Sequence, residues 1–297
     1  TVGKSILESQ IVPLSINKFF ASHIGVFGNT GSGKSNTLHK VFLELFRSVY
    51  RENILEKSRF YIIDFNGEYT KPDSFGVMGI NKKVFDVKTR GKTLKKIPIT
   101  EEYLFDPDIL SILFGASSAT QVPFLRKAMK EWSEKEHRGE VIAKFVVGTM
   151  KKILTTGDAA LSDSKDNWIK VAKSYIAKEY WVIFNQLSSL SYHSMTKAYH
   201  TEGENRLYFN DKSDLTEQEE KSLQIDEIRR KLAESFDSLV LIDRLKFFLD
   251  FQKVHQSAWK STNIEHINPL FHRIDTALNS LKNVVEVKED ISADFSS

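Results

Sequence analysis

Residues 28–35 read GNTGSGKS, which matches the pattern GxxxxGK[ST] at every fixed position. An apolar run at Ile24–Phe27 precedes them and predicts a strand, while apolar residues every three or four positions from Leu38 to Val49 predict a helix. A glycine-rich turn between a strand and a helix directs backbone N–H groups and the positive end of the helix dipole at one oxyanion. This context favours a phosphate-binding loop over the alternative, an ordinary glycine-rich turn.

The residue types in this loop predict the ligands that it binds. The ammonium of Lys34 is expected to reach the β- and γ-phosphates of ATP, and the hydroxyl of Ser35 is expected to ligate Mg²⁺. The residues expected to bind the nucleotide are Gly28, Asn29, Thr30, Gly31, Ser32, Gly33, Lys34, Ser35 and Asn36.

A second motif, IIDFNGEY at residues 62–69, overlaps a run at Phe60–Asp64 that predicts the next strand. Asp64 falls at the tip of that strand, where a carboxylate beside a phosphate-binding loop can hold Mg²⁺ through water. Glu68 could orient an attacking water molecule. We therefore expect Lys34, Asp64 and Glu68 to be catalytic and Asp64 to be a metal ligand; the alternative is an acidic turn without a chemical role.

These two motifs resemble those of the HerA family of hexameric DNA-translocating ATPases, which shares a clan with FtsK. GNTGSGKSNT and IIDFNGEY carry the specific part of the resemblance. Weaker matches are His23, the stretch Ser117–Arg126 with Gln121, and NPLFHRID at residues 268–275. The resemblance implies an α/β fold with a RecA-like P-loop NTPase core, a parallel sheet with flanking helices, that a large helical insertion interrupts.

The resemblance also implies how such a protein works. It implies a homo-oligomer, a hexameric ring, that hydrolyses ATP to move double-stranded DNA through its centre, with the roles above for Gly28–Ser35, Asp64 and Glu68. HerA-like proteins occur with nuclease or NAD-consuming effector proteins, in some cases in phage defence, so an effector partner is expected. The alternative is a nucleotide-regulated scaffold ring that recruits and activates an effector without processive translocation.

Domain boundaries follow from a change in periodicity along the chain. Residues 1–100 predict the N-terminal part of the ATPase core, residues 101–285 a helical insertion lobe, and residues 286–297 a return toward the core. The family's later acidic motif has no match, so its catalytic glutamate, the arginine finger and the remaining core strands are expected outside this chain.

The pattern of apolar residues also predicts individual elements. Further strands are expected at Val84–Val87 and Ile97–Ile99, and a loop is expected at Ser188–Gln218. Helices are expected at Val141–Leu154, Trp168–Leu187, Glu219–His255 and Pro269–Val285, the last with Asn268 as N-cap.

Composition excludes several classes of protein. The chain has no cysteine, which excludes disulfides and thiolate metal sites and favours a cytoplasmic location. No apolar run approaches the ~18–20 residues that span a bilayer, so no membrane association is expected. The 42 Lys and Arg against 39 Asp and Glu leave a net charge of only +3, so a DNA site must be local. Lysines that could bracket a DNA path, or form a solvated face, are Lys82, Lys83, Lys92, Lys95 and Lys96.

Three other readings are disfavoured. Glu286 and Lys288 with Asp275 resemble the ExK pattern of a nuclease, but Asp275 falls in a predicted helix, so a charged strand end is expected. A metabolic P-loop kinase would need a site for a small acceptor, and the helical stretch shows no pattern for one. Aromatic residues at helical spacing are expected in the core instead of stacking on bases: Trp168, Tyr175, Tyr180 and Phe184.

Overall fold

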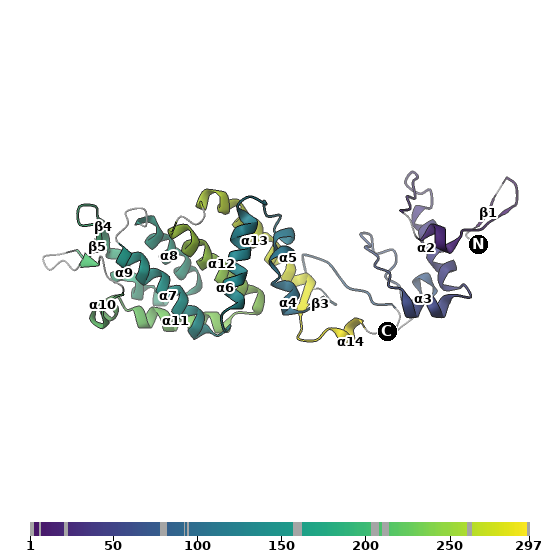
Figure 1. Cartoon of the computed structure of the whole chain (residues 1–297). Coiled ribbons are helices and arrows are strands. Elements are labelled where there is room, and N and C mark those ends of the chain that lie inside the picture. The colour runs from purple at the N-terminus through teal and green to yellow at the C-terminus, as the bar shows by residue number, and fades with distance from the viewer. Residues whose placement is uncertain are drawn as a thin grey trace. The chain divides into compact units, whose positions relative to one another are not determined.

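The computed structural model of the chain is a mostly helical α/β structure (Figure 1). It describes residues 3–5, 7–20, 23–77, 82–91, 93, 95–156, 162–202, 208–209, 214–259 and 263–295. The chain forms two compact units, which are Thr1–Asp86 with Ser292–Ser297, and Val87–Ile291. We call them the P-loop unit and the helical unit. None of the helices in the described part of the chain is long and apolar enough to cross a bilayer.

The P-loop unit contains one long helix and several short elements. Its elements are β1 (Gly3–Lys4), β2 (Ile11–Val12), α1 (Ile16–Phe19), α2 (Lys34–Phe46), α3 (Arg51–Lys57), the 3-10 turn η1 (Ser74–Gly76) and α14 (Ser292–Phe295). The expected helix after the loop is confirmed as α2, although Val49 lies beyond its end. Its buried face packs Phe46 against Phe75 and Val77, with Phe42 and Tyr69 at the edge.

Three segments of residues 1–100 that were expected to be strands do not form strands in the structure. Ile24–Phe27, Phe60–Asp64 and Val84–Val87 form no strand. A strand is held by hydrogen bonds to a neighbouring strand and by burial of at least one face. These segments pair with no strand among the described residues, and the side chains of Phe27 and Ile63 are 93% and 81% exposed. The parallel sheet of a RecA-like core is therefore not formed around this loop in the described residues.

The helical unit begins and ends in a short parallel pair of strands. Strands β3 (Ile97–Ile99) and β7 (Val285–Val287) pair in parallel, with Ile97 opposite Val285, so the strand expected at Ile97–Ile99 is confirmed. The helices between them are α4 (Glu101–Leu104), α5 (Pro107–Leu113), α6 (Gln121–Ser133), α7 (Gly139–Thr156), α8 (Ser162–Tyr175), the 3-10 helix η4 (Lys178–Phe184), α9 (Asn185–Ser189), α10 (Glu217–Ser222), α11 (Ile225–Ser238), α12 (Leu241–Ala258) and α13 (Ile264–Val284).

The segments expected to be helical are confirmed as helical, but two of them divide into several shorter helices. The stretch expected at Val141–Leu154 is α7, whereas Trp168–Leu187 divides into α8, η4 and α9. Glu219–His255 divides into α10, α11 and α12. Gln224, between α10 and α11, has a φ of 53°, which a right-handed helix cannot accommodate. The apolar stripe therefore continues in sequence while the backbone turns.

The start of α13 lies upstream of its predicted position. The cap is Asn263, whose side chain accepts a hydrogen bond from the N–H of Glu265 at 2.9 Å, so the prediction of Asn268 as N-cap is wrong. Pro269 lies inside the helix, where it removes one backbone hydrogen bond. Ile267 is buried in the turn before the proline. Its burial helps to hold that turn in the helix despite the missing bond.

The loop expected at Ser188–Gln218 is partly wrong, because its described residues include a small sheet. Strands β4 (Ser191–His193), β5 (Ala198–His200) and β6 (Tyr208–Phe209) form it in antiparallel order β4–β5–β6. Tyr199 and Phe209 are buried in the core. Strands of two or three residues are too short to show an alternation of apolar and polar residues, so the sequence does not reveal these strands.

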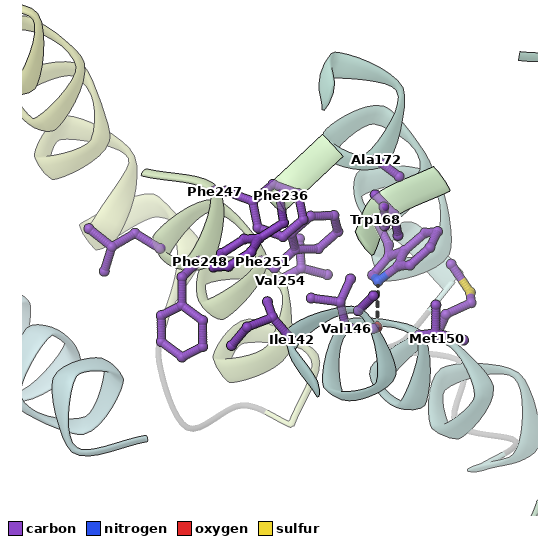
Figure 2. Packing of buried hydrophobic residues seen from close by; sticks show 14 of the residues in the cluster. Ile142, Val146, Met150, Trp168, Ala172, Phe236, Phe247, Phe248, Phe251 and Val254 are labelled. Atoms are coloured by element: carbon purple, nitrogen blue, oxygen red, sulfur yellow. Dashed lines mark hydrogen bonds between the residues drawn. The ribbon is translucent and has the colours of Figure 1, made fainter. Parts of the chain in front are cut away.

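Figure 2 shows a part of the core of the helical unit that is rich in aromatic residues, where side chains of α7, α8, α11 and α12 pack together. Trp168 is 1% exposed, and its indole N–H donates to the carbonyl of Val146 at 3.0 Å, so this buried polar group is satisfied. Phe184 is buried as expected, and the Tyr175 hydroxyl donates to Asp250 at 2.5 Å. Tyr180 is 39% exposed, so the expectation that it belongs to the core is wrong.

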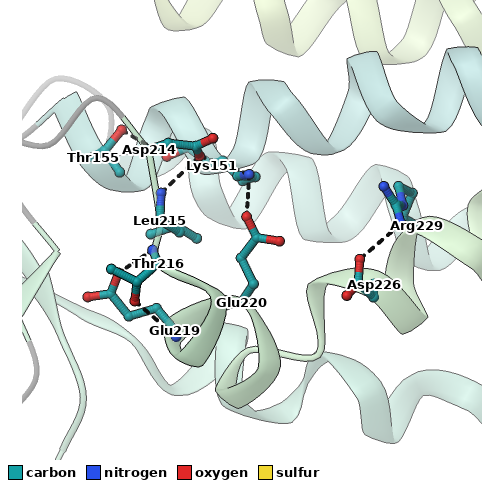
Figure 3. Close-up of polar contacts among 9 residues, drawn as sticks. All are labelled: Lys151, Thr155, Asp214, Leu215, Thr216, Glu219, Glu220, Asp226 and Arg229. Atoms are coloured by element: carbon teal, nitrogen blue, oxygen red, sulfur yellow. Dashed lines mark hydrogen bonds and ion pairs between the residues drawn. The ribbon is translucent and has the colours of Figure 1, made fainter.

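Lys151 of α7, whose side chain is mostly buried, forms ion pairs that connect α7 to α10 and the polar segment before it (Figure 3). The ammonium of Lys151 lies 2.8 Å from a carboxylate oxygen of Asp214 and also contacts Glu220. Thr216 and Glu219 form a capping box that starts α10. Although burial opposes the shift, the two carboxylates raise the pKa of Lys151 above its usual value. Two negative charges thus compensate one cation that is mostly withdrawn from water.

Candidate functional site

The loop at residues 28–35 takes a conformation that only its glycines allow without strain. Gly31 and Gly33 have φ values of 81° and 87°, in the left-handed region. Gly33 is the N-cap of α2. A Cβ on Gly28 would lie 2.3 Å from the Ser32 hydroxyl oxygen, so a side chain there would require the Ser32 side chain to move. The loop closes on itself because the N–H of Ser32 donates to the carbonyl of Asn29 at 3.1 Å.

The ammonium of Lys34 folds back over this loop. It donates to the carbonyl oxygens of Gly28 and Asn29, at 2.8 Å each. The N–H of Thr37 donates to Gly33 at 2.8 Å and starts the hydrogen-bond ladder of α2, so the N–H groups before it have no acceptor inside the helix. A cation, free N–H donors and the positive end of the helix dipole therefore meet at one place, which suits a phosphate.

Asp64 folds the turn that follows it. One carboxylate oxygen accepts the N–H of Tyr69 at 2.8 Å, and the other accepts the N–H of Glu68 at 3.2 Å. Gly67, with a φ of 71°, lets the chain turn between Asp64 and Glu68. The hydrogen bond from Tyr69 is the main cause that holds the pKa of Asp64 below its usual value of 3.8. Asp64 is therefore ionised at neutral pH and organises the segment that carries Glu68.

Tyr69 connects this turn to α2. Its hydroxyl donates to the carbonyl of Ser35 at 3.0 Å. Its ring lies parallel to that of His39, with centroids 6.4 Å apart, and packs against Phe75 at 5.0 Å. The imidazole Nε2 of His39 accepts the N–H of Phe75 at 3.1 Å. Burial raises the pKa of the Tyr69 hydroxyl, which stays protonated as a donor.

A cavity of about 910 Å³ brings residues of both motifs together. From the loop and the first turn of α2 it is lined by Gly31, Gly33, Lys34, Ser35 and Asn36, and from the second motif by Glu68 and Tyr69. Asp64 is not among the lining residues and reaches the cavity only through the turn that it folds. Gly28, Asn29, Thr30 and Ser32 belong to the loop but do not line the cavity either.

Sequence reasoning missed several residues that line the far part of this cavity. His39, Leu43 and Arg47 extend it along α2, and Lys71 lies on the opposite segment. The signal was present in the spacing, because His39, Leu43 and the C-cap residue Arg47 follow Ser35 at steps of four and thus share one face of α2.

The oxygen donors at this site fit Mg²⁺ better than a metal held entirely by protein. In the described part of the chain, no three His, Cys, Asp or Glu side chains gather as a metal site. Mg²⁺ usually keeps several waters and binds through one or two protein oxygens together with substrate phosphates. The Ser35 hydroxyl and the ionised Asp64 are oxygen donors of that kind, although both oxygens of Asp64 already accept backbone hydrogen bonds.

The other candidate groups have structural partners. Lys82 donates to the carbonyl of Tyr69 at 2.6 Å, Lys83 contacts the carbonyl of Asp294, and Lys96 contacts that of Lys282. Lys82 and Lys83 belong to the P-loop unit, and Lys96 belongs to the helical unit. Lys92 lies outside the described residues.

The nuclease-like residues are also explained by the fold. Asp275 lies in α13 and pairs with Lys246 at 2.9 Å, whereas Glu286 lies on β7. The expected charged strand end is confirmed, because Lys288 follows β7 directly and pairs with Glu286 at 3.4 Å.

Comparison with known proteins identifies one family. The family model described as "Helicase HerA, central domain" matches residues 1–242, which is most of the chain and includes both motifs of the site. No curated protein matches the sequence, and no solved structure matches it.

Proposed function

Because the chain belongs to the helicase HerA central-domain family, we propose that it is a subunit of a ring-shaped, ATP-driven translocase of double-stranded DNA. The observation that best supports ATP use is the loop before α2. There, glycines at positive φ and the Lys34 ammonium converge on a helix N-terminus. Such a site recognises the phosphate groups of a nucleotide.

The loop residues would bind the triphosphate in the following way. Gly28 to Asn36 provide backbone donors, and Lys34 exchanges the carbonyls of Gly28 and Asn29 for phosphate oxygens. Its ammonium keeps strong acceptors in both states, so this exchange costs little. A charge-assisted hydrogen bond contributes about 1.5–3 kcal/mol, so loss of Lys34 should weaken binding by at least about tenfold.

The second motif would act on the reacting end of the nucleotide. Mg²⁺, when bound, supplies charge neutralisation for the phosphates, and the Ser35 hydroxyl and the Asp64 carboxylate are the groups proposed to hold it. Glu68 lines the same cavity as Lys34. We assign to Glu68 the orientation of the attacking water, and to Asp64 the additional role of holding the turn that places Glu68.

The active form is proposed to be a homo-oligomer, a hexameric ring. Charge that develops during phosphoryl transfer is commonly stabilised by an arginine from a neighbouring subunit. A single subunit is therefore expected to bind ATP but hydrolyse it slowly. On the family resemblance we also propose an effector partner, a nuclease or an NAD-consuming enzyme, in phage defence.

The proposal is tested by ATP turnover across a size-exclusion profile, with and without duplex DNA. We expect turnover in the oligomer fractions, stimulation by duplex DNA, and loss of both in Lys34→Ala. Lys57→Ala is the matched control, because Lys57 lies at the end of α3, outside the lining of the cavity. Full turnover in monomer fractions would refute the ring. If duplex DNA does not stimulate ATP turnover and an effector protein binds in a nucleotide-dependent way, the result favours the nucleotide-regulated scaffold ring over the DNA translocase.

A further inference from the structure

Tyr69 is fixed at both ends within the P-loop unit. Its N–H donates to Asp64 at 2.8 Å, and its carbonyl accepts the ammonium of Lys82 at 2.6 Å. Its ring packs against Phe75, with centroids 5.0 Å apart, and lies beside the ring of His39, at 6.4 Å. The backbone of Tyr69 is thus held in the turn that Asp64 folds, and its ring is held by packing.

The free end of this fixed side chain reaches the residue proposed to bind Mg²⁺. The Tyr69 hydroxyl donates to the carbonyl of Ser35 at 3.0 Å. A carbonyl oxygen has two lone pairs, so it can accept this bond in addition to the bond of the helix ladder. The contact therefore attaches the first turn of α2 to the second motif without interrupting the helix.

Phe75 shows that the surrounding packing is specific. It is buried, yet its φ is 65°, a conformation that costs a bulky residue about 1–3 kcal/mol. The bond from its N–H to His39 and its contact with Tyr69 hold it there. Phe75 thus keeps a strained backbone where it packs against Tyr69 and donates to His39.

We propose that Tyr69 is a positioning residue, whose hydroxyl sets the distance between Glu68 and the Ser35 end of the nucleotide site. The proposal rests on the proposed function, since it assigns Mg²⁺ to Ser35 and water orientation to Glu68. Tyr69 itself does not touch the reacting atoms. Its effect follows from geometry, because small displacements of catalytic groups reduce rates strongly.

The test is Tyr69→Phe, which keeps the ring and removes only the hydroxyl. Binding of the slowly hydrolysed analogue ATPγS is measured in Mg²⁺ and in EDTA. We expect the dissociation constant to rise about fivefold in Mg²⁺ and to change less than twofold in EDTA, because the position of the Ser35 hydroxyl affects only the metal-bound form. Tyr61→Phe is the control, because Tyr61 belongs to the same unit and is 87% exposed.

A second readout separates positioning from stability. ATP turnover of the full chain is measured for Tyr69→Phe, Glu68→Gln and the double variant, below the melting temperature of each. If Tyr69 acts through Glu68, its substitution has little further effect once Glu68 is replaced.

The outcomes are distinguishable. Equal weakening of binding in Mg²⁺ and EDTA indicates a structural role and overturns the proposal, as does binding that matches the control. Additive losses of turnover overturn it too. If Lys34→Ala binds ATPγS as well as the wild type, the proposed nucleotide site itself fails, and the role of Tyr69 fails with it.

Discussion

Gly139→Ala is expected to separate two helices at a close contact between them. Gly139 begins α7, and a Cβ at this position would lie 2.4 Å from the carbonyl oxygen of Ala233 in α11. It would also lie 2.5 Å from a carboxylate oxygen of Asp237, whose other oxygen accepts the Gly139 N–H at 2.8 Å. The Asp237 side chain can rotate away, but the backbone carbonyl cannot. The helices must therefore move apart until the 2.4 Å contact lengthens toward the ordinary van der Waals range of 3.4–4 Å.

The cost of this substitution follows from two terms. Overpacking of a tight contact costs about 1–3 kcal/mol, and weakening of a hydrogen bond to a carboxylate adds about 1 kcal/mol or more. We expect the free energy of unfolding of the helical unit to fall by about 2–4 kcal/mol. The helix propensity of alanine offsets little of this loss at the first position of a helix, where the backbone is held by few intrahelical bonds.

The same substitution elsewhere in α7 provides the control. A Cβ on Gly148, in the middle of the helix, would meet no atom within 4 Å. Gly148→Ala should therefore stabilise the unit by about 0.5–1 kcal/mol. Urea unfolding followed by tryptophan fluorescence is the assay, because all four tryptophans of the chain belong to the helical unit. Equal stability of the two variants would refute the packing of α7 on α11.

Three further substitutions test other parts of the structure. Trp168→Phe, which removes the bond to Val146 and leaves a cavity, should lower the free energy of unfolding by about 1–3 kcal/mol in the same urea assay. Lys151→Met should cost about 1 kcal/mol at pH 7. The hydrogen bond from Lys151 holds the pKa of Asp214 below 3.8, so the Lys151–Asp214 pair stabilises the fold above this pH and loses its effect as the pH falls through the lowered pKa. The stability of Lys151→Met should therefore decline less on acidification than that of the wild type. Acid titration followed by circular dichroism measures this difference. Gly33→Ala places a side chain at a φ of 87°, and the resulting strain of about 1–2 kcal/mol should weaken nucleotide binding roughly tenfold in a titration with a fluorescent ATP analogue.

Local sequence signals predicted the features that depend on neighbouring residues. The glycine spacing in residues 28–35 predicted the loop, and the apolar repeats predicted α2 and α7. A helix forms its hydrogen bonds within one segment, so its pattern is readable from that segment alone. The N-cap of α13 was misplaced because Pro269 is a strong starting signal that burial of Ile267 outweighs.

Features that depend on distant partners could not be predicted in this way. A strand exists only when another strand pairs with it, which holds for Ile97–Ile99 and not for Phe60–Asp64 in the described residues. The contact between Tyr69 and Ser35 joins residues 34 positions apart, and no periodicity reveals it. The breaks at Gln224 and Leu239 contain no glycine or proline, so no local sequence signal marks them.

The candidate site shows the same division. The loop residues followed from spacing, whereas the role of Asp64 in folding the turn to Tyr69 required coordinates. The hydrogen bonds that Asp64 accepts within the turn are compatible with its proposed role as a metal ligand. A carboxylate that accepts two backbone bonds is held ionised and oriented, and it retains lone pairs for a water bound to Mg²⁺.

The central claim is that the loop before α2 binds a nucleoside triphosphate through Lys34. The most direct measurement is calorimetric titration of ATPγS with Mg²⁺ into the wild type, Lys34→Ala and Lys57→Ala. We predict saturable binding to the wild type and to Lys57→Ala, and binding at least about tenfold weaker to Lys34→Ala. Equal affinity for all three, or no saturable binding to the wild type, would contradict the claim.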